Sequence, residues 1–200
     1  MYALVEDNEI KQIITNSKSL VIEDVRYPAK IFSLWSQSEL NAIGIYEVIT
    51  DSSNKKDEAY YINTNEEYNF ANNQVTRSWG TATPKRLEDE NAVDEDGENV
   101  LDDDGNQVIN YGLKTEKKRI VKQQASGLLA PTDWYVVKAT EVADYSVPAS
   151  ITTFRADVRA KSNEMETQID ACTTVEQLET LYTRDENGTR PLAEFPKEVV

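Results

Sequence analysis

The chain has 200 residues, enough for one medium domain or two small ones with a sizeable core. Its 36 acidic and 21 basic residues give a formal net charge of −15, which repels phosphate backbones and anionic lipid, so we expect neither nucleic acid nor a membrane as partner. Histidine is absent and Cys172 is the only cysteine, which removes the commonest general base and metal ligand and any internal disulfide.

Residues 1–87 are predicted to form a small antiparallel β domain. Turn-forming residues separate runs rich in β-branched and aromatic side chains, which predicts hairpins around 6–9 and 72–73. Ser36 and Glu39 have the spacing of a capping box, and Gly44 can adopt the left-handed turn that ends a helix, so a two-turn helix is expected between them. The expected strands are 2–5, 10–14, 20–22, 45–49, 60–62, 68–71 and 74–79.

Residues 88–112 form an acidic insertion, because the stretch 88–110 holds ten acids and no base. Two copies of one pattern, each with Asp-Gly between apolar ends, predict a protruding hairpin arm. The acids that could serve as calcium ligands are Asp94, Asp96, Asp102 and Asp104. An EF-hand loop needs glycine at its sixth position, where the copies have Asn99 and Gln107, so we expect solvated acidic turns and leave open a looser calcium site.

Residues 113–183 are predicted to form a helical module. A helix is expected over 114–129, with Pro131 stopping it, Thr132 capping the next helix and Trp134 filling the corner between the two as core. After Pro148, apolar residues recur at heptad spacing over three heptads. The residues of this apolar ridge are Ile151, Phe154, Val158, Met165, Ile169 and Cys172. We expect the ridge to pack against a symmetry mate or against helix 114–129.

The end of the chain combines a short helix with an irregular segment. Thr173 and Glu176 have capping-box spacing and predict a short helix with Val175, Leu178 and Leu181 inward. Residues 184–200 are expected to be an extended tail, ordered only where it lies on other parts of the protein. The predicted fold class is therefore α+β, with an N-terminal β domain, an acidic hairpin arm and a C-terminal helical module.

The residues that could carry catalysis are few. Cys172 belongs to the apolar ridge and is expected to be buried and inert, and no glycine-rich phosphate loop is present. Carboxylate pairs of the kind that hydrolyse glycosides stay open, because acids are abundant and their separation cannot be read from sequence. We expect no enzymatic activity, no catalytic residue, no cofactor and no metal.

One set of residues resembles a known group of proteins. It starts with Leu128, Leu129, Thr132, Asp133 and Trp134, continues with Val147, Pro148, Phe154, Arg155 and Arg159, and ends with 174–178. This set resembles the C-terminal module of small bacteriophage tail proteins, the tail-fibre and tail-fibre-assembly group. The stretch 26–48, RYPAKIFSLWSQSELNAIGIYEV, resembles the front of marine phage proteins that carry this module.

The resemblance implies a virion structural protein of the tail, folded in the host cytoplasm, either a fibre component or an adaptor between fibre and baseplate. Other phage tail proteins and further copies of the chain are the expected partners. The expected interface residues are Ile151, Phe154, Val158, Met165, Ile169 and Trp134. Two alternatives stay open: an assembly chaperone absent from the mature particle, and a carbohydrate-binding receptor module that uses exposed aromatics such as Trp79.

Overall fold

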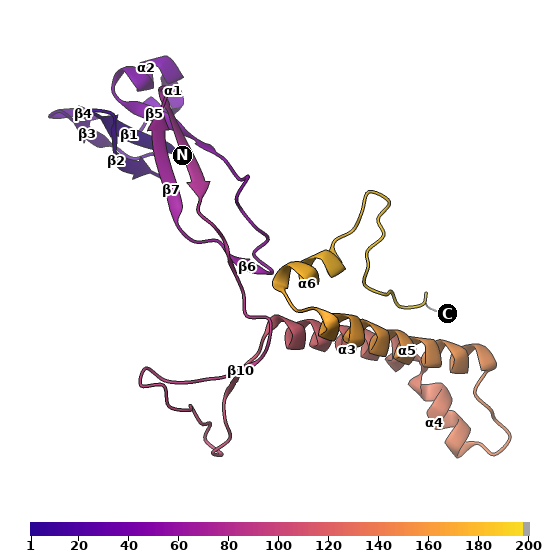
Figure 1. The fold of residues 1–200 in the computed structure, drawn as a ribbon. Helices are drawn as coiled ribbons and strands as arrows, with labels where there is room; N and C mark the ends of the chain where they lie inside the picture. Colours follow the sequence, from indigo (N-terminus) through magenta and orange to yellow (C-terminus); the bar gives the residue numbers. More distant parts are fainter. Residues whose placement is uncertain (198–200) are drawn as a thin grey trace. The chain divides into compact units, whose positions relative to one another are not determined.

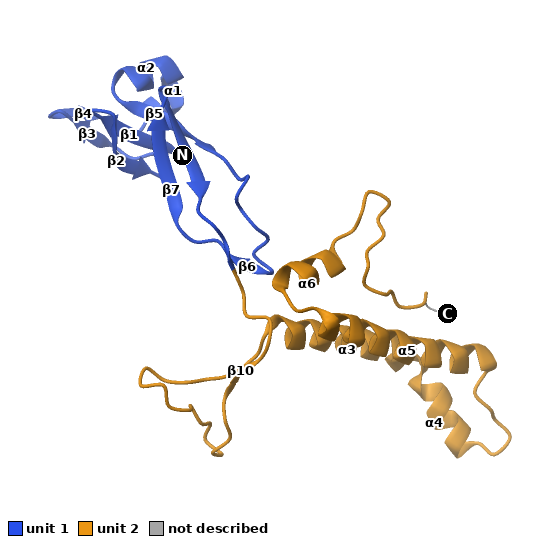
Figure 2. Cartoon of the chain, in the orientation of Figure 1, with its two compact units in different colours: residues 1–83 blue, residues 84–200 orange. Residues whose placement is uncertain are grey.

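The computed structural model describes residues 1–197, and the chain divides into two compact units, Met1–Thr83 and Pro84–Val200 (Figure 1) (Figure 2). Helices account for 36% and strands for 24%, so the α+β class predicted from the sequence is confirmed. The boundary lies shortly before the expected one at 87/88, and the acidic segment belongs to the helical unit.

The first unit is built on a five-stranded sheet in the order β2-β1-β5-β8-β7. These strands are β1 (Tyr2–Glu6), β2 (Glu9–Ile14), β5 (Ile45–Thr50), β7 (Glu66–Ala71) and β8 (Gln74–Trp79). All neighbours are antiparallel except β5 and β8, which run parallel and depart from the purely antiparallel expectation. The reason is topological: the chain passes from β5 to the edge strand β7 first, and the β7–β8 hairpin then returns in the direction of β5.

Two-residue turns of positive φ set the hairpins. Asp7 and Asn8 join β1 to β2, and Asn72 and Asn73 join β7 to β8, at the predicted places. A third such turn, Glu23-Asp24, joins β3 (Leu20–Ile22) to β4 (Val25–Tyr27). Turns with two left-handed residues match the right-handed twist of paired strands, which explains why each hairpin is tight.

The sheet buries apolar side chains on both faces, because β1 is an interior strand and its residues alternate between the two faces. Ala3 and Val5 join one cluster, with Val48 and Val75, while Leu4 faces the other. The members of that second cluster are Leu4, Ile14, Leu20, Ile22, Ile31, Leu40 and Ile45. It is covered by α1 (Ile31–Leu34), α2 (Gln37–Ala42) and the β3–β4 hairpin. The first unit therefore has a core on each side of one strand.

The predicted capping box at the start of α2 is present. The Ser36 Oγ accepts from the Glu39 N–H at 3.3 Å, and the Glu39 carboxylate accepts from the Ser36 N–H at 2.8 Å. Gly44 has a φ of +78°, as expected for the residue that ends the helix. A Cβ at Gly44 would lie 2.5 Å from the Val5 carbonyl oxygen, so glycine is required there.

The acidic arm leaves the helical unit as a two-stranded stem, β10 (Glu90–Asn91) with β11 (Ile109–Asn110). Each sequence repeat forms the same turn: Asp94 Oδ1 accepts two backbone N–H groups, and Asp102 Oδ1 does the same. Three backbone hydrogen bonds form a closed ring: the Val100 N–H donates to the Ala92 carbonyl, the Val108 N–H to the Val100 carbonyl and the Ala92 N–H to the Val108 carbonyl. Backbone bonding thus orders an arm that has little apolar core.

Before the arm, β6 (Tyr61–Ile62) pairs with β9 (Thr83–Pro84).

The helical unit is organised around the apolar ridge. Its helices are α3 (Leu113–Leu129), the short 3₁₀ helix η1 (Ala130–Thr132), α4 (Asp133–Glu141), α5 (Ala149–Ala171) and α6 (Val175–Tyr182). The ridge side chains of α5 are all buried, and Val121 and Ala125 of α3 are buried with them. Ion pairs Lys118–Asp170 and Lys122–Glu166, at 2.7 and 3.3 Å, join the two helices. The ridge therefore packs within the chain, against the helix expected at 114–129.

The described part of the predicted tail, 184–197, is held by α5 and α6. Leu192 is 2% exposed and its N–H donates to the Leu181 carbonyl at 3.0 Å. Ala193 donates to the Gln168 side chain at 2.8 Å, and Phe195 packs against the cluster of Phe154 and Val158. The tail thus covers part of the ridge, and residues 198–200 of that prediction lie outside the described residues.

The cap of α6 lies one residue later than predicted. Thr174, not Thr173, is the N-cap, and its Oγ1 accepts from the Gln177 N–H at 3.2 Å. The Gln177 side chain, rather than that of Glu176, reaches back to the Thr173 N–H at 2.7 Å. Two consecutive threonines allow either register, and the register with Val175 and Leu178 buried is the one adopted.

Val158→Asp tests the burial of the ridge. A carboxylate placed at this fully buried position has no basic partner, so the free energy of unfolding should fall by about 3 kcal/mol or more in a denaturant titration. Ala160→Asp, on the exposed side of the same helix, is the matched control and should shift stability little. Equal unfolding midpoints for the two variants would contradict a buried ridge.

Tyr182→Phe tests the packing at α6. The Tyr182 hydroxyl is buried without a hydrogen-bond partner among residues 1–197, and burial raises its pKa from 10.0 to about 12. Because the folded pKa lies above the unfolded one, stability present below pH 10 is lost as pH rises towards 12. Tyr182→Phe should remove this decrease in the free energy of unfolding at alkaline pH and should leave the free energy of unfolding at pH 7 unchanged. Tyr111→Phe, at an exposed ring, should leave the loss unchanged, and equal losses in both variants would contradict the assignment.

Candidate interaction surface

The expected interface residues separate into two groups. Five of them belong to the ridge and are buried within the single chain, so they are not accessible to a partner: Ile151, Phe154, Val158, Met165 and Ile169. Trp134 is 52% exposed, so the prediction that it fills the helix corner as core was wrong. Of the six, only Trp134 is accessible to a partner in the structure described here.

Thr132 occupies the corner that was assigned to Trp134. It is 6% exposed, and its hydroxyl donates to the Leu129 carbonyl at 2.7 Å instead of capping α4. Two residues along a helical turn rotate a side chain by roughly 200°, so an inward Thr132 sends Trp134 outward. The aromatic ring is thereby presented to solvent.

Arg155 fixes this corner, and its role could not be read from the ridge pattern because it lies one position beside the ridge. The Arg155 Nη1 contacts the Thr132 Oγ1 at 2.5 Å, the Leu129 carbonyl at 3.1 Å and the Asp133 carboxylate at 2.7 Å. Its side chain is largely buried. The structure therefore brings together several residues of the tail-protein resemblance, and they act as a polar clamp between α5 and the start of α4.

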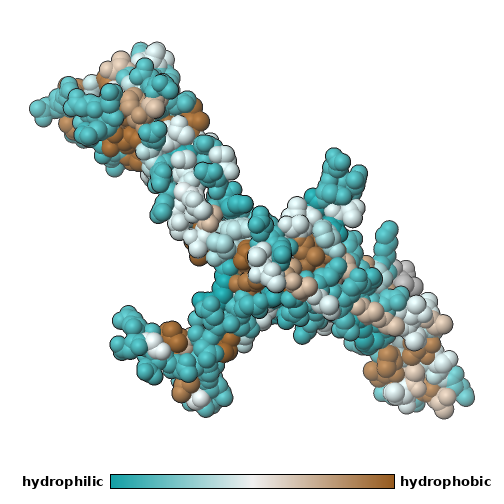
Figure 3. Space-filling model, viewed as in Figure 1, coloured by the Kyte–Doolittle hydropathy of each residue, from teal (hydrophilic) through white to brown (hydrophobic). Residues whose placement is uncertain are grey.

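Helix α4 presents apolar side chains that the rest of residues 1–197 covers only in part. None of its nine residues is buried. The exposed apolar side chains on and just after α4, here called the α4 surface, are Trp134, Val137 and Val142; Val136, two residues after Trp134, is exposed on the opposite side of the helix. Figure 3 shows hydrophobic residues gathered where Figure 1 places α4. Isolated helices shorter than ~12–15 residues are marginal in water, so α4 gains stability from any partner that covers this surface.

Aromatic contacts organise the α4 surface. The rings of Trp134 and Tyr135 stack with centroids 3.8 Å apart. The Lys138 ammonium lies 4.3 Å from the centroid of the Tyr145 ring and 5.9 Å from that of Trp134. Such cation–π contacts hold the base beside the aromatic rings. The surface thus combines one lysine with aromatic rings, the residue class that is enriched at protein contact sites.

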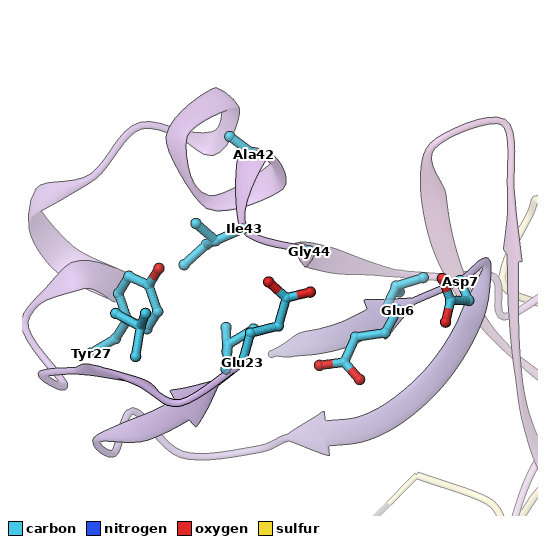
Figure 4. A pocket seen from close by; sticks show the side chains of 10 residues that line it. Glu6, Asp7, Glu23, Tyr27, Ala42, Ile43 and Gly44 are labelled. Atoms are coloured by element: carbon cyan, nitrogen blue, oxygen red, sulfur yellow. The ribbon is translucent and has the colours of Figure 1, made fainter.

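A second feature, in the first unit, is a hollow of about 360 Å³ beside the β1–β2 and β3–β4 turns (Figure 4). Glu6, Asp7 and Glu23 line it together with apolar side chains such as Ile22 and Ile43, and no base does. Figure 4 shows the carboxylates of Glu6 and Glu23 in the space below the Ile43–Gly44 segment. An aliphatic stem ending in a cation, as in lysine or arginine, matches this lining in shape and charge.

The hollow is also the acid-lined cleft that a glycosidase would need, so the enzymatic alternative stays a hypothesis. Catalytic carboxylate pairs depend on unequal surroundings that separate the acid from the base. Here Asp7 and Glu23 are both exposed to solvent. The surroundings favour binding of a cation over catalysis.

The other sequence candidates lie outside both features. Within residues 1–197 no group of three or more acidic, histidine or cysteine side chains is placed to hold a metal ion, Asp94, Asp96, Asp102 and Asp104 included. Trp79 is 7% exposed and covered by Lys55 and Arg77, so its expected exposure was wrong. Cys172 is buried as expected, and desolvation raises the pKa of its thiol.

Trp134→Ala tests whether the ring lies at the surface. Removing an exposed ring should change the free energy of unfolding by less than about 0.5 kcal/mol. Phe154→Ala, which removes a buried ring from the ridge, is the contrasting variant and should cost about 3–5 kcal/mol. Chemical denaturation of both variants checks this, and a loss above 2 kcal/mol for Trp134→Ala would put the ring back in the corner.

Among residues 1–197, the α4 surface and the acid-lined hollow are the two features considered as contact sites for other molecules. None of the helices in residues 1–197 combines the length and the apolar character that a membrane span requires. No family model, curated protein or solved structure matches this chain.

Proposed function

We propose that this chain is a structural protein of a bacteriophage tail, a fibre component or an adaptor between fibre and baseplate, which acts by packing against other proteins. The observation that carries the proposal is the α4 surface: a helix of nine residues, none of them buried, with a tryptophan and two valines exposed. A surface of this kind is typical of a chain that completes its packing in an assembly. The choice of a phage tail as the assembly rests on the resemblance of the corner residues to those of small bacteriophage tail proteins.

In this proposal the two units have different tasks. The helical unit presents α4 to a partner, held in direction by the Arg155 clamp. The β unit attaches to neighbouring tail proteins, and its acid-lined hollow suits a basic side chain on one of them. The acidic arm, with ten acids and no base between 88 and 110, extends into solvent and limits unwanted association by like-charge repulsion.

Two other roles remain as alternatives. An assembly chaperone would use the same α4 surface on a fibre tip and then leave the particle. A carbohydrate-binding receptor module would need exposed aromatics around a groove, and the residue named for that role, Trp79, is buried under Lys55 and Arg77. The C-terminal segment 184–197 packs onto α5 and α6. This packing favours a permanent structural protein over a chaperone that binds transiently.

Quantitative mass spectrometry of purified particles of the encoding phage tests the proposal. Peptides of this chain should be present at a fixed copy number per particle, and Val137→Asp should lower incorporation at least tenfold, because it places a charge on the α4 surface. Ala160→Asp, on the exposed side of α5, is the control and should be incorporated normally. Peptides found in the lysate of infected cells but absent from finished particles would contradict a virion role and favour the chaperone.

A further inference from the structure

We propose that the acidic arm is a contact module with approximate three-fold symmetry, and that its partner is the end of a homotrimeric protein with basic residues around its three-fold axis. The inference deepens the packing role proposed above by naming a partner for the arm, and it rests on that role. It does not depend on the assembly being a phage tail.

The arm contains a third copy of the repeated hairpin, which only the fold reveals. One residue pair bridges the two strands of each hairpin at the same place. The three bridged pairs are Val93–Asn99, Leu101–Gln107 and Ile109–Asn91. The first two lie in the sequence repeats, which form the separate loops beyond the β10 stem in Figure 1. The third lies in the stem itself, whose strands β10 and β11 come from opposite ends of the arm. The arm is therefore three equivalent hairpins, the third of which opens into the rest of the chain.

The ring of backbone hydrogen bonds relates these hairpins by an approximate three-fold axis. Ala92, Val100 and Val108 recur every eight residues, and each donates to the next around the ring at 2.8–2.9 Å. Each bond joins corresponding positions of two copies, and the ring closes after three bonds, so the copies are arranged around one axis. The Gln107 side chain departs from this symmetry, and its Nε2 donates to the Ala92 and Val108 carbonyls at 2.9 and 2.8 Å.

Three apolar side chains, here called the apolar triad, occupy corresponding positions around this axis. They are Val93, Leu101 and Ile109, each directly after a residue of the ring. Val93 is 56% and Leu101 57% exposed, while Ile109, in the stem, is partly buried. Rotation about an axis does not change the position along it, so the three side chains lie at one level of the axis. A single exposed apolar residue is ordinary, but three related by one axis form a contact surface of defined symmetry.

The symmetry of the triad points to the symmetry of its partner. Three equivalent contact points meet the same residue three times only when the partner repeats that residue around a three-fold axis. A homotrimer does so at either end of its axis. A monomer or a dimer would offer each point of the triad a different surface, and the equivalence of the hairpins would then contribute nothing to binding.

The charge of the arm determines which residues surround that axis on the partner. The turns of the two closed hairpins carry Glu95, Asp96, Asp103 and Asp104, and no base lies between 88 and 110. Basic residues on the partner complement these turns, whereas like-charge repulsion keeps acidic surfaces away. The stem hairpin has no such turn, because its strands continue into the chain. We therefore expect the charge contact at two of the three positions and the apolar contact at all three.

Site-specific photo-crosslinking of the full chain, in the cells that produce it, tests the inference. A phenylalanine carrying a benzophenone group replaces Val93, Leu101 or Ile109, one position at a time. All three labels should crosslink to the same peptide of one protein, because the three positions meet three copies of the same residue. Native mass spectrometry of that protein should show a homotrimer. A label at Ala160, on the exposed side of α5, is the control and should not reach that peptide.

Neutralising the acids of one hairpin at a time tests the basic surroundings. Glu95→Gln with Asp96→Asn, and Asp103→Asn with Asp104→Asn, should each lower the crosslinking yield of the Ile109 label about fivefold. The two losses should be equal, because the hairpins are equivalent. The aspartates that accept the turn hydrogen bonds are unchanged in both variants. Unfolding midpoints equal to wild type would show that the labelled chains and these variants fold.

Every other result contradicts the inference. Labels that reach different peptides, a captured protein that is not a trimer, yields no higher than at Ala160, or unequal losses in the charge variants would each overturn it. Asn91, the exposed bridge partner of Ile109, takes the third label if a label at Ile109 lowers the midpoint. A chain present in finished particles without a shared peptide would overturn the inference and leave the tail role standing. A shared peptide with the chain absent from finished particles would support the inference and contradict the virion role.

Discussion

The burial of the α5 ridge against α3 and the C-terminal tail is the interaction on which the helical unit depends. Every apolar ridge residue lies inside the chain, and residues as distant in sequence as Ala125 and Phe195 pack in the same cluster. Close-packed interiors of this kind supply most of the stability of a small helical unit. Because the ridge is closed within one chain, any contact with another protein has to use a different surface.

That other surface is determined by the corner between η1 and α4. Thr132 turns inward, Arg155 binds the Thr132 hydroxyl, the Leu129 carbonyl and the Asp133 carboxylate, and α4 leaves the ridge without burying a residue. A charged clamp with several hydrogen bonds fixes direction better than an aromatic wedge would, because guanidinium geometry is planar and its donors are fixed. The clamp therefore links the buried ridge to the exposed α4 surface.

Local patterns in the sequence predicted the helices and their caps well. They predicted poorly which way a side chain points and which strands pair. Heptad spacing identified α5, and the Ser36–Glu39 spacing identified the cap of α2, because both depend on residues close together in the chain. The outward turn of Trp134 depends on the phase of the preceding 3₁₀ turn, which the sequence does not reveal. The parallel β5–β8 pair depends on a long connection that carries no local signal.

The candidate surfaces were harder still to predict. An apolar ridge has the same sequence pattern whether it packs against a neighbouring helix or against a second chain, so periodicity could not decide between the two. The acid-lined hollow joins residues from two hairpin turns and the end of α2, which only the fold brings together. The sequence placed Trp134 at the start of a helix, and only the fold shows that no residue of this helix is fully buried.

Hydrogen exchange of backbone amides, measured on the wild-type chain at 10 μM and again near 1 mM, would examine the division between closed ridge and open helix. Amides of α5 between Ile151 and Ile169 should exchange slowly at both concentrations, whereas those of α4, which has no fully buried residue, should exchange faster. Protection of α5 that appears only at high concentration would show that the ridge is the intermolecular contact and would contradict this description.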